Sequence, residues 1–246
     1  LAGFMIRPID SLRINADFQF GYNSLSYSQN WPRQFQTYKI HAGYRPTRWS
    51  MFDGAVDIRE NRNNAANINN LEHGRTYSLA TSLLPNSSFA LSLGYNYTDV
   101  YMQSTICFRN VQNAPTHYNA CPYFGGTAQL IYGALSFYSN KQHFTHAEIM
   151  WKPVNRVTAS VGYAGTFAGG NTLFLSPLML PGTLGFNYQK PTASIGIDLY
   201  KGLSYQVGWN YYGYNVKTPS SLPGLQPIGS EDFNGSNAMF AVRYAF

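Results

Sequence analysis

The sequence contains few charged residues. Only 11% of its 246 residues are Asp, Glu, Lys or Arg, whereas about 25% is usual in soluble domains. Aromatic residues reach 16%. A protein surface with so few charged and so many aromatic side chains would be poorly solvated if water covered all of it. We therefore expect part of the surface to face an apolar environment.

Long apolar runs are also absent. A transmembrane helix needs about 20 consecutive apolar residues, and the nearest candidate, residues 173–180, is interrupted by Ser176 and Pro177. A membrane-spanning helix is excluded, which leaves β-strands as the only elements that could cross a membrane. The first residues show neither the basic segment nor the apolar segment of a signal peptide. We interpret the chain as mature, processed or partial.

Several classes of site lack their motifs. The sequence has no Cys-x-x-Cys-His for covalent haem attachment, no phosphate-binding loop, no nucleophile elbow and no zinc motif. His146 and Glu148 are two residues apart and would share one face of a strand, as an acid-base or metal pair does, whereas His143 would face the other way. No nucleophile held by a third group accompanies them. We interpret them as polar lining, and predict no enzyme activity and no cofactor bound by this chain.

The excess of basic residues does not indicate nucleic-acid binding. The formal net charge is +6, but the cations do not gather with stacking aromatics in one groove, as a nucleic-acid site requires. They collect instead beside short turns, where only Asp10 opposes them. Such a rim suits anionic lipid headgroups, and an acidic periplasmic partner is the alternative. The rim residues are Arg7, Arg45, Arg48, Lys152, Arg156 and Lys201.

What fills the sequence is alternation of apolar and polar residues. Residues 12–22 place Leu12, Ile14 and Phe18 among six apolar or aromatic positions on one face, and Arg13 and Asp17 on the other. A period of two is the signature of a β-strand with two different faces. The same alternation recurs over residues 37–44, 52–59, 76–83, 89–98, 146–151, 157–163, 193–199, 203–211 and 238–246.

Short turns and long polar stretches separate the alternating segments. Turns recur at residues 7–10, 45–48, 84–87, 152–155 and 200–202, whereas loops are expected over residues 61–70, 104–140 and 217–235, with a strand at residues 130–138 as an alternative within the second loop. The alternation changes parity near Pro191, which predicts a bulge there. Short turns on one side and long loops on the other are typical of outer-membrane barrels. A soluble β-sandwich is the alternative, but its strands average about 5 to 6 residues.

The polar parity of the alternating segments predicts which residues would line a barrel. Many of these positions are small, which would let another backbone approach closely: Ser78, Ala80, Ser82, Ala90, Ser92, Gly94, Ser160, Gly162, Ser194, Gly196, Ala241 and Ala245. The charged and histidine residues predicted to face the lumen are Arg13, Asp17, Lys39, His41, Asp53, Asp57, Arg59, His146, Glu148, Asp198 and Arg243.

The last residues carry the clearest family signal. Residues 238–246 alternate strictly, with Phe240, Val242, Tyr244 and Phe246 on one face. This ending resembles the C-terminal strand of Gram-negative outer-membrane β-barrels, whose assembly machinery reads a terminal Phe and the aromatics before it. The resemblance implies that Tyr244 and Phe246 form an assembly signal. It also implies aromatic girdles, for which the candidates are Tyr22, Tyr44, Trp49, Tyr97, Trp151, Tyr200 and Tyr211.

These observations predict an all-β fold in which residues 1–246 form one antiparallel transmembrane β-barrel domain of the bacterial outer membrane. Together with residues 1–6, which lead into the first short turn, the alternating segments make eleven strands. Single-chain bacterial barrels have an even number of strands and both termini in the periplasm. An odd count predicts that this is the C-terminal part of a larger barrel, with at least one strand supplied by an upstream segment or by another chain.

Two functional classes fit such a barrel. One is a passive or ligand-selective porin for small solutes. The other is a scaffold whose wide lumen is occupied by a partner protein or by an N-terminal segment; the small lumen-facing residues favour it. The rhythm of Tyr44-Arg45-Pro46 at a hairpin and the Arg- and Asn-rich loops resemble porins associated with decahaem cytochromes. That resemblance implies haem on a separate partner chain and electron transfer across the outer membrane.

We predict a disulfide between Cys107 and Cys121 in a surface loop, because an oxidising compartment favours pairing and the spacing fits no metal or redox motif. Closing about 15 residues stabilises by about 3 kcal/mol in the chain-entropy model, here mainly by ordering the loop. Thiol titration of the unfolded, unreduced protein should find no free thiol. Two reactive thiols would reject the pairing.

Overall fold

The computed structural model describes residues 1–24, 31–64, 70–109, 131–173, 185–200, 202–217 and 232–244, although not the side chains of residues 105–109, 131–136 and 173. Within these ranges the protein is all-β, and no helix is long and apolar enough to cross a membrane. The eleven predicted strands are confirmed: β1 Ala2–Ile9, β2 Leu12–Tyr22, β3 Gln34–Thr47, β4 Ser50–Asn63, β5 Asn70–Asn86, β6 Phe89–Arg109, β7 Ile131–Val154, β8 Val157–Leu173, β9 Phe186–Tyr200, β10 Leu203–Val216 and β11 Phe233–Tyr244.

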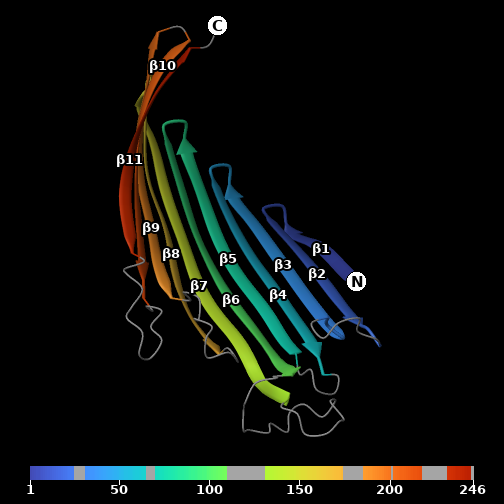
Figure 1. Ribbon diagram of the computed structural model, residues 1–246. Coiled ribbons are helices and arrows are strands. Elements are labelled where there is room, and N and C mark those ends of the chain that lie inside the picture. Colours follow the sequence, from blue (N-terminus) through green and yellow to red (C-terminus); the bar gives the residue numbers. More distant parts are fainter. Residues whose placement is uncertain are drawn as a thin grey trace.

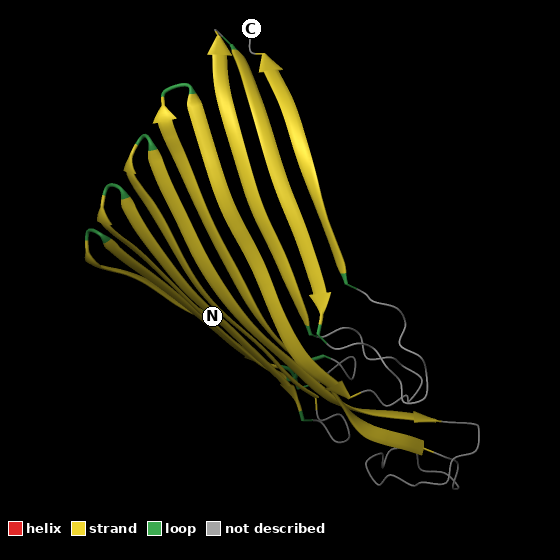
Figure 2. Cartoon of the chain, turned by 90° about the vertical axis from the view of Figure 1, so that its left-hand side faces the viewer, coloured by secondary structure: helices red, strands yellow, loops and turns green. Residues whose placement is uncertain are grey.

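The strands form one antiparallel sheet in which each strand pairs with its neighbours in sequence, in the order β1 to β11. Figures 1 and 2 show a twisted, curved sheet with β1 and β11 at its two edges. Among the described residues, β1 pairs with β2 and β11 pairs with β10, and the two edges do not pair with each other. The sheet is therefore open.

The short connections all lie at one end of the sheet, where Figure 2 draws them as a staircase of tight turns. They join β1 to β2, β3 to β4, β5 to β6, β7 to β8 and β9 to β10, each through only two residues. Gly202, in the last of these turns, has a φ of 77°, a left-handed conformation that costs other residues about 1 kcal/mol or more. Trp49 and Ser87 lie in the two-residue turns that join β3 to β4 and β5 to β6.

The pairing register gives the sheet two chemically different faces. Residues directly opposite each other in an antiparallel pair project to the same side. Ile40 lies opposite Ala16 and Val56, and this apolar row continues through Tyr77 to Tyr97. The residues of the other parity form a second, polar face, so the alternation predicted from the sequence keeps one phase across the sheet. We call these the apolar face and the polar face.

The two edge strands run in the same direction, because they are separated by an even number of reversals in an antiparallel order. Direct pairing of β1 with β11 would therefore be parallel. An entirely antiparallel closed sheet would need one more strand between them.

The predicted bulge at Pro191 is wrong. β9 pairs with β8 in one unbroken register from Ile197 to Phe186, through a direct Pro191 and Tyr163 pair. On its other side, β9 has the same register with β10 before and after Pro191. The proline removes one backbone donor but leaves the strand extended. As a consequence, Phe186 and Tyr188 lie on the polar face.

Three predicted loops are shorter than expected, because the strands continue beyond the alternating segments. β4 extends to Asn63 and β5 begins at Asn70, inside the loop predicted at 61–70. The backbone of Cys107 lies in β6, so its predicted place in a loop is wrong, and β7 begins at residue 131. β11 begins at Phe233, inside the loop predicted at 217–235. In these extensions the alternation is weak, since polar residues occupy both parities.

Candidate functional site

The apolar face carries large, solvent-exposed side chains on every strand. Leu79 is 58% exposed, Val161 62% and Phe240 67%, although nothing in their chemistry favours water. On β6 this face presents only apolar and aromatic residues from Phe89 to Tyr97, which matches the roughly 9 to 11 residues that a tilted strand uses to cross a bilayer. We call this zone the apolar band.

A charged border ends the apolar band on the side away from the short turns. Ile58, the last apolar residue of β4, lies opposite Arg75, which lies opposite Asp99, which in turn lies opposite Lys141. Arg75 donates to the Glu60 Oε1 atom at 2.8 Å, and the His73 Nε2 atom lies 4.0 Å from Asp99 Oδ2. The apolar face therefore changes abruptly from apolar to charged.

Aromatic pairs lie at both limits of the apolar band. Tyr44 and Phe52 pack at 6.3 Å near the short turns, and Tyr77 and Tyr97 stack at 6.1 Å next to the charged border. The Tyr95 hydroxyl lies 2.7 Å from the Nδ1 atom of His143. Of the predicted girdle residues, Tyr44, Trp49, Trp151 and Tyr200 are exposed near the short turns. Tyr22, at the far end of β2, is exposed as well.

The polar face is charged over β2 to β4. Lys39 lies directly between Asp17 and Asp57 in the register, an arrangement that favours opposite charges. Arg59 binds Asp57 through two contacts of 3.2 Å. Because positive and negative side chains alternate, this sector is nearly neutral although it is strongly polar.

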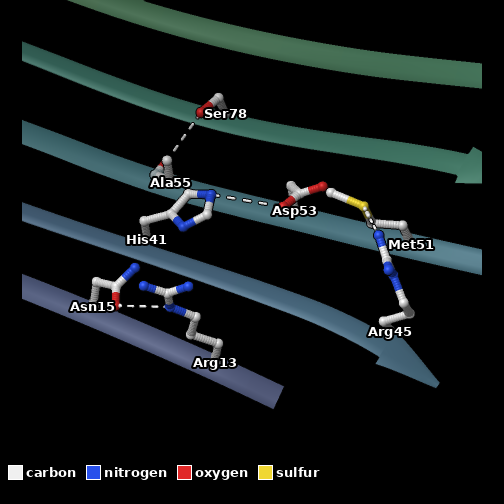
Figure 3. A network of polar contacts seen from close by, with 8 residues as sticks. All are labelled: Arg13, Asn15, His41, Arg45, Met51, Asp53, Ala55 and Ser78. Carbon is white, nitrogen blue, oxygen red and sulfur yellow. Dashed lines mark hydrogen bonds and ion pairs between the residues drawn. The ribbon is translucent and has the colours of Figure 1, made fainter. Parts of the chain in front are cut away.

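Figure 3 shows the part of the charged sector closest to the short turns. The His41 Nε2 atom lies 3.6 Å from Asp53 Oδ1, and Arg13 donates to the Asn15 Oδ1 atom at 3.4 Å. The His41 side chain is 51% exposed and that of Asp53 28%. The contacts are long and exposed, so they contribute little to stability. All eleven residues predicted to face the lumen share the polar face in the register.

Small residues occupy the polar face from β5 to β10. Some of them accommodate larger neighbours: a Cβ added at Gly94 would overlap the His146 ring, and one at Gly162 would come within 2.7 Å of the Thr192 hydroxyl. Others border open space, since a Cβ at Gly196 would meet only two backbone oxygens, at 3.9 and 4.0 Å. The small residues are therefore of two kinds, and only the second kind leaves room for another molecule.

An aromatic stack on the polar face was missed by the sequence reasoning. The Phe186 and Tyr214 rings lie 5.3 Å apart, and the Tyr214 and Phe233 rings 5.2 Å apart, across three neighbouring strands. Beside the stack, the Lys190 Nζ atom lies 5.4 Å from the centre of the Tyr212 ring. The bulge predicted at Pro191 would place Phe186 on the apolar face. If the alternation is instead continued without a break through Pro191, the sequence places Phe186 on the polar face, where the stack forms.

The register separates His143 from His146 and Glu148. His146 and Glu148 lie on the polar face and His143 on the apolar face, as predicted. In the parts of the chain that the structure describes, no three His, Cys, Asp or Glu residues gather closely enough to hold a metal ion.

The remaining predicted residues lie mostly near the short turns. Arg7, Arg45, Arg48, Lys152 and Arg156 are all exposed there, while Lys201 lies outside the described residues. Tyr244 is 57% exposed on the edge strand, opposite Leu203, and Phe246 lies outside the described residues. Cys121 and the Cys107 side chain also lie outside them, so their pairing stays a prediction.

No protein-family model matches the sequence, and no curated protein matches it. We therefore infer the function from the chemistry of the apolar face and the polar face.

We predict that Gly94→Gln destabilises the fold because its side chain displaces the His146 ring, and that His146→Ala relieves the effect. The coupling between the two changes should be about 1 kcal/mol or more, as is usual for residues in contact. Urea unfolding of the four proteins in detergent micelles measures it. Gly74→Gln is the matched control, since a Cβ at Gly74 meets nothing within 4 Å. Additive effects of Gly94→Gln and His146→Ala would contradict the packing.

Proposed function

We propose that the chain forms the membrane-spanning wall of a β-barrel in the bacterial outer membrane, with the apolar face toward lipid and the polar face toward the interior. One observation carries this proposal: an exposed apolar band that continues across the sheet and, from β4 to β7, ends at a charged border. A water-soluble sheet would cover such a surface with another layer. Contiguous apolar patches larger than a few hundred Å² are rare on soluble monomers.

The dimensions of the band support the proposal. From Phe89 to Tyr97 the band measures about 26 Å along the strand at about 3.3 Å per residue, which is about 20 Å of height at a strand tilt of about 40°. Bacterial outer-membrane barrels carry an outward apolar band about 25 Å tall with aromatic residues at both limits. The pairs Tyr44 with Phe52 and Tyr77 with Tyr97 lie at these limits. The short turns would face the periplasm, together with the exposed basic rim.

The interior of such a barrel would not be filled by its own side chains. About eight strands give a barrel that side chains can fill, and larger barrels enclose space. This sheet has eleven strands, and its polar face includes open positions such as Gly196 and Gly208. Water or another polypeptide must therefore occupy the space. The first gives a passive or ligand-selective pore, and the second gives a scaffold.

The scaffold is the second candidate function, and the open small-residue tract favours it. Ser160 and Ser194 join their hydroxyls at 2.8 Å, and Gly196 and Gly208 lie close to them in the register of β9 and β10. This leaves a low, polar surface bordered by Asp198 on β9. Such a surface lets a second backbone approach, such as that of a multihaem cytochrome that carries electrons across the membrane.

We predict that Leu79→Arg strongly impairs folding into lipid vesicles, whereas Ala80→Arg does not. The two positions are adjacent on β5 but lie on opposite faces, and Ala80 has Asp53 opposite it in the register. Arginine on the lipid-facing side costs about 2 to 4 kcal/mol at the bilayer centre and less toward the interfaces, and Leu79, opposite Tyr95, lies between the two. Urea titration of the protein folded in vesicles measures the difference. Equal effects of the two substitutions would reject the assignment of the faces.

We predict that the assembly purified from membranes contains a second polypeptide, and that Gly196→Gln combined with Gly208→Gln releases it while the barrel stays folded. Added side chains at these positions would fill the space for a partner without clashing with the chain itself. Native mass spectrometry measures the partner, and an absorption scan shows whether it carries haem. A wild-type preparation that lacks any partner and conducts ions freely in planar bilayers would reject the scaffold and support the pore.

A further inference from the structure

A polar hollow of about 430 Å³ opens on the apolar face next to the charged border. Strands β7 and β8 form most of it, and Lys217, which follows β10, lines it from another side. Lys141 and His143 project from β7 on the parity of the apolar face, opposite Gly169 and Phe167 of β8. Most of its lining residues therefore belong to the surface that we assign to lipid, although Ala168 and Gly170 of β8 have the parity of the polar face.

The hollow is positively charged. Two lysines and a histidine line it together with the neutral polar residues Ser139 and Asn171. Within the described ranges, no carboxylate lies within 4.0 Å of the Lys141 or Lys217 amine. Asp99 lies opposite Lys141 in the register, but its ion pair is with His73. An anionic group could therefore bind both amines without displacing an existing ion pair.

The depth of the hollow indicates the kind of anion. Lys141 belongs to the charged border, opposite Asp99. His143 is its neighbour on the apolar face of β7 and contacts the Tyr95 hydroxyl near the limit of the apolar band. If the apolar band spans the membrane, this is the depth of lipid headgroups in the leaflet opposite the short turns. Phe167 lines the hollow, and the exposed Tyr163 follows toward the apolar band, where acyl chains would lie.

We propose that this hollow binds the phosphate group of a phosphorylated lipid in that leaflet. Lys141 and Lys217 would neutralise the phosphate, and Ser139 and Asn171 would donate hydrogen bonds to its oxygens. The proposal rests on the proposed function, because it needs the apolar band to lie in a membrane. It concerns a different surface and a different leaflet from the basic rim beside the short turns.

Gly169 makes a steric test possible. A Cβ added at Gly169 meets nothing within 4 Å, and the residue lines the hollow. Gly169→Leu therefore fills part of the hollow without displacing the protein and without changing its charge. Gly74, with equally open surroundings on the polar face, provides the control Gly74→Leu.

The test uses the full chain folded in phosphatidylcholine nanodiscs that contain phosphatidic acid as the phosphorylated probe. Native mass spectrometry of the released protein counts the retained lipids. The wild type should retain phosphatidic acid in preference to phosphatidylcholine, and Lys141→Ser or Lys217→Ser should each lower retention about fivefold, the contribution of one basic residue near a charged membrane surface. Gly169→Leu should lower retention as well. Lys39→Ser, Lys190→Ser and Gly74→Leu, all on the polar face, should not.

Protease protection of the same nanodiscs separates the two proposals. Retention that is equal in all variants of a correctly inserted protein rejects the lipid site and leaves the barrel assignment intact. Displacement of phosphatidic acid by millimolar inorganic phosphate also rejects it, since the hollow would then bind phosphate from any source. Failure of the wild-type chain to insert rejects both proposals.

Discussion

The antiparallel register is the constraint on which the rest of the structure depends. Side chains alternate between the faces of a strand, so a shift of one residue between two neighbours would move every apolar residue of one strand to the polar face. The register avoids this over most of each pairing and shifts only beside the short turns, as the row from Ala16 through Ile40 and Val56 to Tyr77 illustrates. The side-chain alternation therefore stays in step between neighbouring strands. Both proposed surfaces, one toward lipid and one toward the interior, result from this alignment.

The sequence predicted the faces well because the period of two is local information. Leu79 and Ala80 can be assigned to opposite faces from their neighbours alone. The ends of the strands could not be predicted in the same way. Beyond the charged border both faces are polar, so β6 continues past Ser104 and β5 begins at Asn70 with little change in alternation. The short turns were easier to find, since proline or glycine marks most of them.

Features that depend on contacts between strands could not be predicted from the sequence. The overlap between a Cβ at Gly94 and the His146 ring joins residues far apart in sequence, and only the register of β6 with β7 brings them together. The same holds for the stack of Phe186, Tyr214 and Phe233. The error at Pro191 has a physical origin: a proline in a strand removes one backbone donor without requiring a bulge.

The open sheet links the fold to the proposed function. Two unpaired edges that run in the same direction are exposed to pairing with other strands, and in the proposed barrel a further strand would cover both. The polar face combines a nearly neutral charged sector, centred on Lys39 between Asp17 and Asp57, with a sector of small residues. The first sector is suited to water, and the second to the close approach of a partner.

Quenching of tryptophan fluorescence by brominated lipids tests the central assignment most directly. Single tryptophans would replace successive residues of β6 from Phe89 to Leu93 in a protein whose four native tryptophans are phenylalanine. We expect alternation, with strong quenching at Phe89, Leu91 and Leu93 and weak quenching at Ala90 and Ser92. Equal quenching at both parities, or none at either, would contradict a sheet with one face in lipid.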